Sequence, residues 1–388
     1  MKCSYSSLPM LGLLFVASIV VSPLSQAQTL TVLHNFSSTG PDGQLPLAGL
    51  VLANGNFYGT TEQGGSRAGT GTVFQLDAKG HETVLYAFTG TGGSFPSAGL
   101  VRDAEGNLYG TTTEGGQFNL GTVFKLDSSG VETVLHHFEG GTDGSIPFAG
   151  LILDAAGNLY GETNAGGDAT CNCGTVFEIG ADGAESVLYR FTGGTDGSVP
   201  VTGNLIRDSA GNLLGTTADG GASGQGAVFK IHPDGTETTL YSFTGKSDGG
   251  SPYSNLIRDG KGNLYGTTSG GGTFRFGTVF KIDSRGNETV LHNFAGGSDG
   301  ESPMAGLVLD SKGNLYGTTI AGGVVGKYGY GTVFEISQNG TETVLHAFNR
   351  LDGASPAVGL IIDGKGNLYG TTSSGGVQGR GTVFKVTP

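Results

Sequence analysis

Short apolar runs alternate with glycine-rich links along the whole chain. In one stretch of about forty residues, four such runs occupy residues 99–103, 107–112, 121–127 and 132–138. Each run is rich in Val, Leu, Thr, Tyr or Phe and is bounded by Gly, Asp or Asn, which is the pattern of β-strands. None has the length or the period of an amphipathic helix. The pattern therefore predicts short strands only, which we name a, b, c and d in chain order.

This four-strand unit recurs along the chain. The phrase Gly-Asn-Leu-Tyr-Gly-Thr-Thr spans strand b, and its tyrosine position falls at Tyr58, Tyr109, Tyr160, Leu214, Tyr265, Tyr316 and Tyr369. A period near fifty residues is typical of propellers and solenoids. The a–b and c–d links are tight turns, such as Asn54-Gly55, whereas the b–c and d–a links are longer. A four-stranded meander followed by a step to the next meander is a propeller blade.

The two ends of the repeat region complement each other. It opens with a lone d-type run at residues 31–36 and closes with a, b and c runs at 359–363, 367–372 and 381–385. In a ring the opening strand completes the last blade and removes an exposed sheet edge. We therefore predict one seven-bladed β-propeller of four-stranded antiparallel blades over residues 28–388, closed by pairing of the N-terminal strand with the last blade. An open β-solenoid or a stack of sheets is the alternative.

Residues 1–27 have the pattern of a secretory signal peptide. Lys2 is followed by a short apolar stretch at residues 10–21 and by small residues that end at Ala27. This stretch is too short to span a bilayer, and no second one follows, although a membrane anchor is the alternative. We expect a secreted protein, periplasmic or extracellular, that is a monomer with no transmembrane segment after cleavage.

The amino-acid composition and the net charge exclude one fold class and one class of partner. Glycine accounts for 75 of 388 residues without a triplet period, which excludes collagen. The formal net charge is −13, and a field of that sign repels phosphate backbones, so we expect no nucleic-acid partner.

The repeated phrases also resemble a known family. Residues 314–319, 321–323, 331–334 and 342–346 are similar to the GloVer tandem repeat of secreted bacterial choice-of-anchor proteins. The resemblance covers nearly all of residues 29–388 and implies an exported, surface-associated β-repeat protein. It supplies no catalytic residues. Family members often end in a sorting tail, and its absence here favours a soluble or periplasmic form.

Most recurring residues have a structural interpretation. We expect Tyr109 and its equivalents to fill the core with the hydroxyl bonded, and Gly110 to permit close approach of Phe124. The Asp-Gly-x-x-Pro links, at Asp143 and its equivalents, read as turns, because one carboxylate per loop is too few for calcium. A His or Tyr recurs in strand d, as at His136, and we expect it to pack at the outer rim. The sequence thus predicts no catalytic residue, no metal and no cofactor.

Two cysteines are unique to one b–c link. Cys171 and Cys173 lie in a chain that we expect to be exported, where disulfides form, so we favour a disulfide between them over two free thiols. Two cysteines without further ligands do not make a zinc site.

The b–c links vary most while the scaffold repeats. Variable aromatic and polar side chains on a rigid ring suit recognition. The candidate ligand-binding residues are Phe118, Asn119, Phe274, Arg275, Phe276, Tyr328, Tyr330 and Arg380. We therefore favour a binding protein for an unknown glycan, peptide or protein, recognised through the b–c and d–a links. A propeller-type lyase or lactonase, with acids and imidazoles at the pore, and a purely structural envelope protein are the alternatives.

Overall fold

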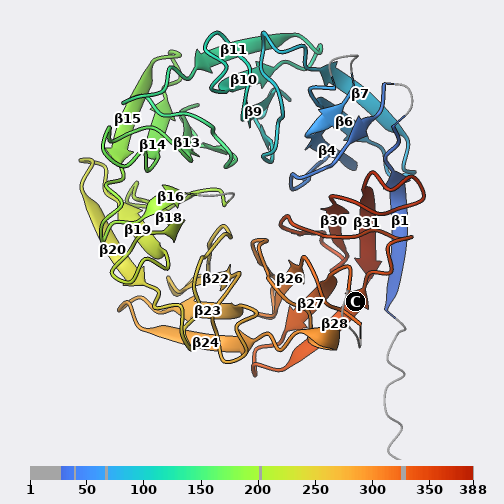
Figure 1. The fold of residues 1–388 in the computed structure, drawn as a ribbon. Helices are drawn as coiled ribbons and strands as arrows, with labels where there is room; N and C mark the ends of the chain where they lie inside the picture. Colours follow the sequence, from blue (N-terminus) through green and yellow to red (C-terminus); the bar gives the residue numbers. More distant parts are fainter. Residues whose placement is uncertain (1–27, 39–40, 66–68, 201–202, 325–328, 388) are drawn as a thin grey trace, which may run out of the picture.

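The structure is a closed ring of seven β-sheets around a central channel (Figure 1). It is a computed structural model and describes residues 28–38, 41–65, 69–200, 203–324 and 329–387. The predicted signal peptide lies outside these residues. Within them, no helix has the length and hydropathy needed to cross a bilayer.

Each blade is a meander of strands a to d, counted from the channel outward. The blades are β3 (Val51–Ala53), β4 (Asn56–Thr61), β6 (Thr72–Leu76) and β7 (Glu82–Ala87); β8 (Val101–Arg102), β9 (Leu108–Thr112), β10 (Thr122–Leu126) and β11 (Glu132–His137); β12 (Ile152–Leu153), β13 (Leu159–Thr163), β14 (Thr175–Ile179) and β15 (Glu185–Arg190); β17 (Ile206–Arg207), β18 (Leu213–Asp219), β19 (Ala227–Ile231) and β20 (Glu237–Ser242); β21 (Ile257–Arg258), β22 (Leu264–Thr268), β23 (Thr278–Ile282) and β24 (Glu288–Asn293); β25 (Val308–Leu309), β26 (Leu315–Thr319), β27 (Thr332–Ile336) and β28 (Glu342–Ala347); and β29 (Ile361–Ile362), β30 (Leu368–Thr372), β31 (Thr382–Thr387) and β1 (Thr29–Asn35).

Four short elements lie in the links. Strand β2 (Gly43–Gln44) pairs with β5 (Gln63–Gly64), and β16 (Ser198–Pro200) adds a fifth strand to the fourth blade by pairing with β18. A single 3-10 turn, η1 (Gly297–Asp299), is described.

The ring closes through its N-terminal strand, as the sequence predicts. Strand β1 pairs antiparallel with β31 from Thr29 opposite Thr387 to Asn35 opposite Thr382. In Figure 1 the blue β1 lies beside the red β31, so residues from the two ends of the repeat region share one blade. Its sheet order, β1-β31-β30-β29, confirms the seven-bladed propeller and its closure.

The hydrophobic core lies between neighbouring blades. The phenylalanine that follows each strand d packs edge-to-face on the strand-c phenylalanine of the next blade, as Phe88 does on Phe124 with ring centroids 5.1 Å apart. The same contact crosses the closure, where Phe36 of the first strand meets Phe74 at 5.2 Å. Both rings of each such pair are fully buried. Aromatic contacts of this kind add about 0.5–1.5 kcal/mol beyond the buried area.

The glycine inside strand b is explained by the same packing. A Cβ added at Gly110 would lie 2.7 Å from Cζ of Phe124 and 2.9 Å from Cδ2 of Leu100. This confirms the close approach expected from the sequence.

Candidate functional site

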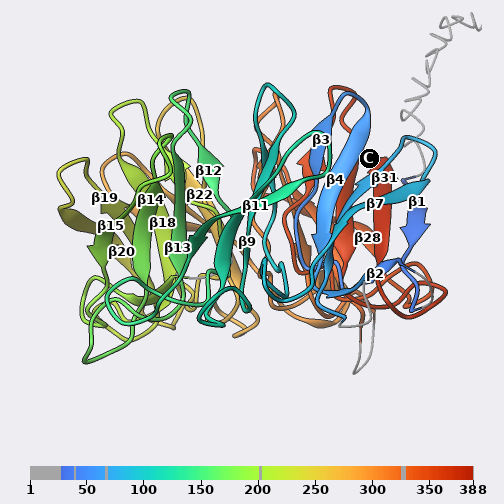
Figure 2. The same ribbon diagram turned by 90° about the horizontal axis from the view of Figure 1, so that it is seen from above.

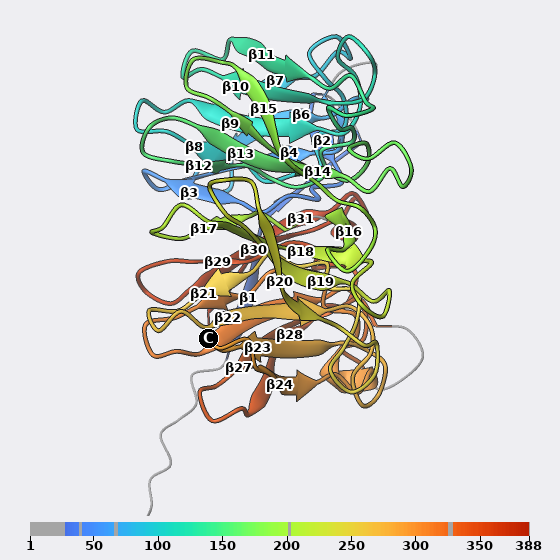
Figure 3. The same cartoon turned by 90° about the vertical axis from the view of Figure 1, so that its left-hand side faces the viewer.

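The two faces of the ring are built differently. The a–b and c–d turns lie on one face, which we call the turn face, and the longer b–c and d–a links lie on the other, which we call the loop face (Figures 2 and 3). The channel connects them.

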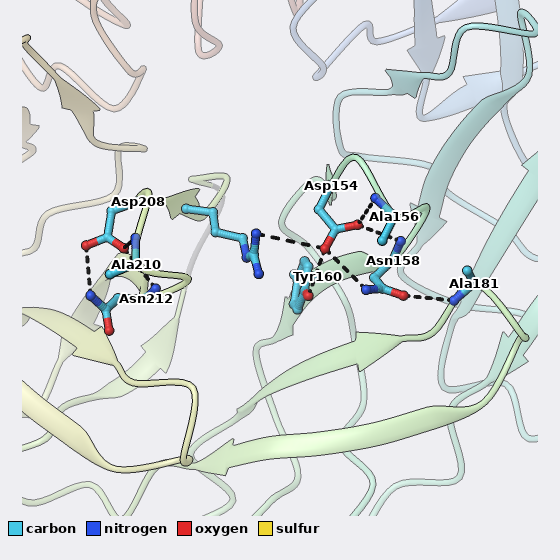
Figure 4. A network of polar contacts seen from close by, with 9 residues as sticks. Asp154, Ala156, Asn158, Tyr160, Ala181, Asp208, Ala210 and Asn212 are labelled. Carbon is cyan, nitrogen blue, oxygen red and sulfur yellow. Dashed lines mark hydrogen bonds and ion pairs between the residues drawn. The ribbon is translucent and has the colours of Figure 1, made fainter.

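Polar groups on the turn face largely bond to one another. Asp154 accepts hydrogen bonds from the backbone N–H and the side-chain Nδ2 of Asn158, at 3.0 and 3.2 Å, and from the hydroxyl of Tyr160 at 3.2 Å (Figure 4). Arg207 of the next blade lies 3.9 Å from the same carboxylate. The hydroxyls of five of the strand-b tyrosines are bonded to an Asp in this way, as predicted, namely those of Tyr109, Tyr160, Tyr265, Tyr316 and Tyr369.

The channel contains a cavity of about 350 Å³. Its wall is formed by the segment before strand a in each blade, and its larger side chains include the apolar ones of Leu47, Phe148 and Met304 and the phenol of Tyr253. Two blades carry an asparagine, Asn204 or Asn255, where the other five have glycine. A Cβ at Gly306 would collide with the amide of Asn255, so glycine on one blade makes room for the amide of another. Among the described lining residues none is His, Asp or Glu.

One position of the d–a link presents side chains on the loop face. The residue directly before the proline of each d–a link has a positive φ of 51–58° in every blade, although it is never glycine. Ile146 is an example. Its N–H donates to the carbonyl of Leu120, and its own carbonyl accepts from the N–H of Asn164. A bulky residue is strained there and persists only where the surroundings hold it. The position is apolar in the first four blades and serine in the last three, at Leu45, Phe95, Ile146, Val199, Ser251, Ser302 and Ser355.

The residues predicted for ligand binding fall into three groups. Phe118, Phe274 and Phe276 are exposed on the loop face, at 42%, 53% and 38%, and Arg275 and Arg380 are exposed beside them in the b–c links. Most of the other exposed large apolar side chains of the described residues also lie on the loop face, Val324 and Val377 in b–c links and Ile146 and Leu351 in d–a links.

The remaining predicted residues have other roles. Asn119 has a positive φ of 57°, and its side-chain oxygen accepts the Gly115 N–H at 3.1 Å, so it shapes the loop. Tyr330 is half-buried against the hydrophobic core that includes Phe348. Tyr328 lies outside the described residues.

The outer rim joins groups that the sequence analysis treated separately. Nε2 of His136 lies 3.2 Å from Oδ1 of Asp143, and the hydroxyl of Tyr189 donates to Asp196 at 3.0 Å. The recurring interval of six to eight residues between the strand-d His or Tyr and the Asp was the signal that could have revealed these pairs. Each Asp also accepts a backbone N–H, as Asp143 does from Glu139, which confirms its role in the turn.

A buried carboxyl on β13 was also missed. Glu162 occupies the position at which the other six blades have threonine. Its side chain is buried, its Oε1 has no hydrogen-bond partner, and burial raises its pKa well above the ordinary value. In the other blades the threonine at this position donates to the next blade, as Thr111 does to the carbonyl of Ala149. Burial therefore favours the neutral form of the Glu162 carboxyl.

Glu288 gives a testable pH dependence. Burial, and then the negative charge of Asp248, raise its pKa from 4.5 to about 7, and Tyr241 is the other titratable group that faces this pair. The Glu288 carboxyl has a pKa near 4.5 in the unfolded chain and near 7 in the folded chain. A rise in pH across this interval therefore lowers the free energy of unfolding. We expect Glu288→Gln to raise the melting temperature at pH 8, by about 2 °C after allowance for solvent screening, and to change it little at pH 4.

The matched control for this variant is Glu105→Gln at an exposed turn. Melting curves from pH 4 to pH 8 test the prediction. An E288Q gain that is equal at both ends of this range would contradict it.

The two cysteines of the b–c link lie together. Sγ of Cys171 and Sγ of Cys173 are bonded as a disulfide in the structure, beside Gly193 of the following d–a link.

Comparisons with known proteins agree with this architecture. No curated protein matches the chain. Among solved structures, it resembles the extracellular domain of a putative hybrid two-component system from B. thetaiotaomicron, with a TM-score of 0.58, 13% identity, and coverage of 93% of this chain and 41% of that one. A second extracellular domain, of a putative one-component system from the same organism, gives 0.56, 11%, 90% and 39%. The chain therefore spans about two fifths of these two proteins.

A third similar structure is a putative 6-phosphogluconolactonase from Bacteroides uniformis, with a TM-score of 0.52, 18% identity, and coverage of 79% and 85%. At these identities the similarities show the propeller fold alone. The family model of the Gloeobacter/Verrucomicrobia repeat matches residues 17–208 and again residues 201–388. The chain therefore belongs to the Gloeobacter/Verrucomicrobia repeat family.

Proposed function

We propose that this protein is exported and binds a peptide or protein segment through its loop face. The observation that carries the proposal is the concentration of exposed large apolar side chains in the b–c and d–a links, including Phe118, Phe274 and Phe276. Exposed apolar groups gathered on one face mark interaction sites, and aromatic anchors dominate such interfaces.

Three further features support this role. The left-handed positions of the d–a links hold apolar side chains on one half of the ring and serines on the other, so a bound chain would meet two different surfaces. The adjoining cavity, with Phe148, Tyr253 and two asparagine amides, is large enough for a side chain. Propellers of the same fold also serve as extracellular domains of putative sensor systems.

A lyase or lactonase would need carboxylates or imidazoles that converge on the channel. The described lining instead carries apolar, hydroxyl and amide groups, which favours binding over catalysis. Glu162 is buried in the blade and is not among the lining residues. A glycan is the alternative ligand, and the test below distinguishes it from a peptide.

The test compares two surface variants of the exported chain. Phe118→Ser, Phe274→Ser and Phe276→Ser together remove the aromatic side chains from the loop face. The control combines Leu52→Ser and Val131→Ser on the turn face, where the side chains are 39% and 59% exposed. Each protein is screened against a displayed peptide library and a glycan array, and its melting curve is recorded.

We expect peptide ligands of the native protein to bind the triple variant at least tenfold more weakly, because each lost anchor costs about 1–2 kcal/mol. The control should bind normally, and the melting temperature of both variants should stay close to that of the native protein. Undiminished binding by the triple variant would contradict the assignment of the face. If the native protein binds only on the glycan array, the ligand is a glycan and not a peptide.

A further inference from the structure

Neighbouring blades meet at the outer rim in a repeated arrangement that we call a rim junction. A junction brings together the strand-d His or Tyr of one blade, the Asp of the following d–a link, and the first residue of strand d in the next blade; after Tyr86 the Asp is replaced by Gly92. At three junctions these residues include an imidazole and two carboxylates, one of them formed by His292, Asp299 and Glu342. Among the described residues, the ligand atoms all lie within 4.8 Å of one another at the other two. The two sets are His34, Asp42 and Glu82, and His136, Asp143 and Glu185.

The first of these junctions contains three polar atoms without partners. Nε2 of His34, Oδ1 of Asp42 and Oε1 of Glu82 are buried and make no hydrogen bond, and the first two lie 3.7 Å apart. A buried polar atom left unbonded costs about 1–3 kcal/mol, so three that converge need an explanation. Burial, and then the charge of Asp42, also raise the pKa of Glu82 to about 7.

The surroundings hold these ligand atoms in place. Oδ2 of Asp42 accepts the backbone N–H of Ser37 at 2.7 Å, which leaves Oδ1 facing the junction. The ring of His34 packs edge-on against Phe36, with centroids 4.8 Å apart. Contacts of this kind fix the ligands of metal sites.

The second junction repeats this support. Asp143 accepts the backbone N–H of Glu139 at 2.6 Å, and His136 packs edge-on on Phe138 at 4.8 Å. Here His136 and Asp143 are already paired at 3.2 Å, and the unpartnered buried atom is Oε1 of Glu185.

We propose that these two rim junctions each bind one divalent transition-metal ion of the zinc type. One imidazole nitrogen and two carboxylate oxygens supply three ligands, and water completes a tetrahedral set. Calcium is disfavoured, because it takes six to eight oxygen ligands. An ion at the first junction would tie the closing strand β1, which carries His34, to Glu82 in the first blade. It would also offset the repulsion between two carboxylates.

The chain contains its own controls. At two junctions tyrosine replaces histidine beside the same pair of acids, as at Tyr189, so tyrosine fits this position in the fold. At another, His346 pairs with Asp352 at 3.0 Å, but the next strand d is β1. Leu30 of β1 pairs with Val386, just as Glu132 pairs with Leu126 in the second blade. Leu30 therefore occupies the position of the glutamate, and the second carboxylate is missing.

The experiment titrates Zn²⁺ into the exported chain by calorimetry and follows Co²⁺ by its visible absorption. The variants are His34→Tyr, His136→Tyr, the double variant, and His346→Tyr as the control. We expect each of the first two to lose one equivalent of bound Zn²⁺ and the double variant to lose two, while H346Y keeps the native stoichiometry. Circular dichroism verifies that each variant folds, and Ca²⁺ should not compete.

Melting curves give a second measurement. Zn²⁺ should raise the melting temperature of the native protein, because an ion that binds only the folded state stabilises it, and this rise should vanish in the double variant. No Zn²⁺ binding, an unchanged stoichiometry in both H34Y and H136Y, or an equal loss in H346Y would overturn the proposal.

Discussion

Deletion of residues 28–36 should lower the melting temperature of a protein that spans residues 28–388 by about 10 °C or more, or cause it to aggregate. The deletion removes β1, which pairs with β31 over six residue pairs, and it removes Phe36, which is fully buried against Phe74. Loss of a buried phenylalanine alone costs about 3–5 kcal/mol, and a large domain loses about 2–4 °C per kcal/mol. The deletion also leaves β31 as an open edge that can pair with another chain.

Addition of the missing strand as a separate peptide distinguishes loss of this strand from a general folding defect of the truncated chain. A synthetic peptide of residues 28–36 should add to the exposed edge of β31 and restore most of the lost stability, since strands readily complete open sheets. The same peptide with Phe36→Ala should restore much less. A truncated chain that melts like the native protein would show that the ring does not depend on this strand.

Gly110→Ala should destabilise the protein by about 2 kcal/mol or more. The added Cβ would lie 2.7 Å from Phe124 and 2.9 Å from Leu100, and both of these side chains are buried. Overpacking of a filled core costs about 1–3 kcal/mol, because the surrounding side chains must leave their preferred rotamers. Denaturant unfolding of the native and variant proteins measures the difference.

The control is Gly260→Ala, at an exposed turn where an added Cβ meets nothing within 4 Å. Phe124→Leu combined with Gly110→Ala provides a second check, because a smaller residue at 124 should relieve part of the clash. The two changes should therefore cost less together than the sum of their separate costs. Equal stability of G110A and G260A would refute the packing explanation for this glycine.

Local sequence was sufficient to predict the fold. The spacing of Tyr58 and its equivalents gave the number of blades, and the lone d-type run at residues 31–36 gave the ring closure, which the pairing of β1 with β31 confirms. These inferences work because each blade is specified by its own strand and turn residues. The contact of Gly110 with Phe124 was predictable for the same reason, since both residues belong to adjacent strands of one blade.

The candidate sites were predictable only in part. Exposure of Phe118 and Phe274 in the b–c links follows from their place in variable loops. The loop-forming role of Asn119 depends on a left-handed backbone at that residue, and the partial burial of Tyr330 depends on its packing between blades. Neither property is expressed in the residue type alone.

The sequence by itself determined the strand content, the repeat and the family, because these depend on residues near one another in a fifty-residue unit. It also determined the ring closure, because the lone d-type run at the start of the repeat region complements the missing strand at its end. Only the tertiary structure decided which residues from different blades meet. Glu82 lies beside His34 and Asp42, and Asn255 lies beside Gly306, because the ring places neighbouring blades face to face. Such contacts lie about forty to fifty residues apart in the chain, so no local pattern of residues encodes them.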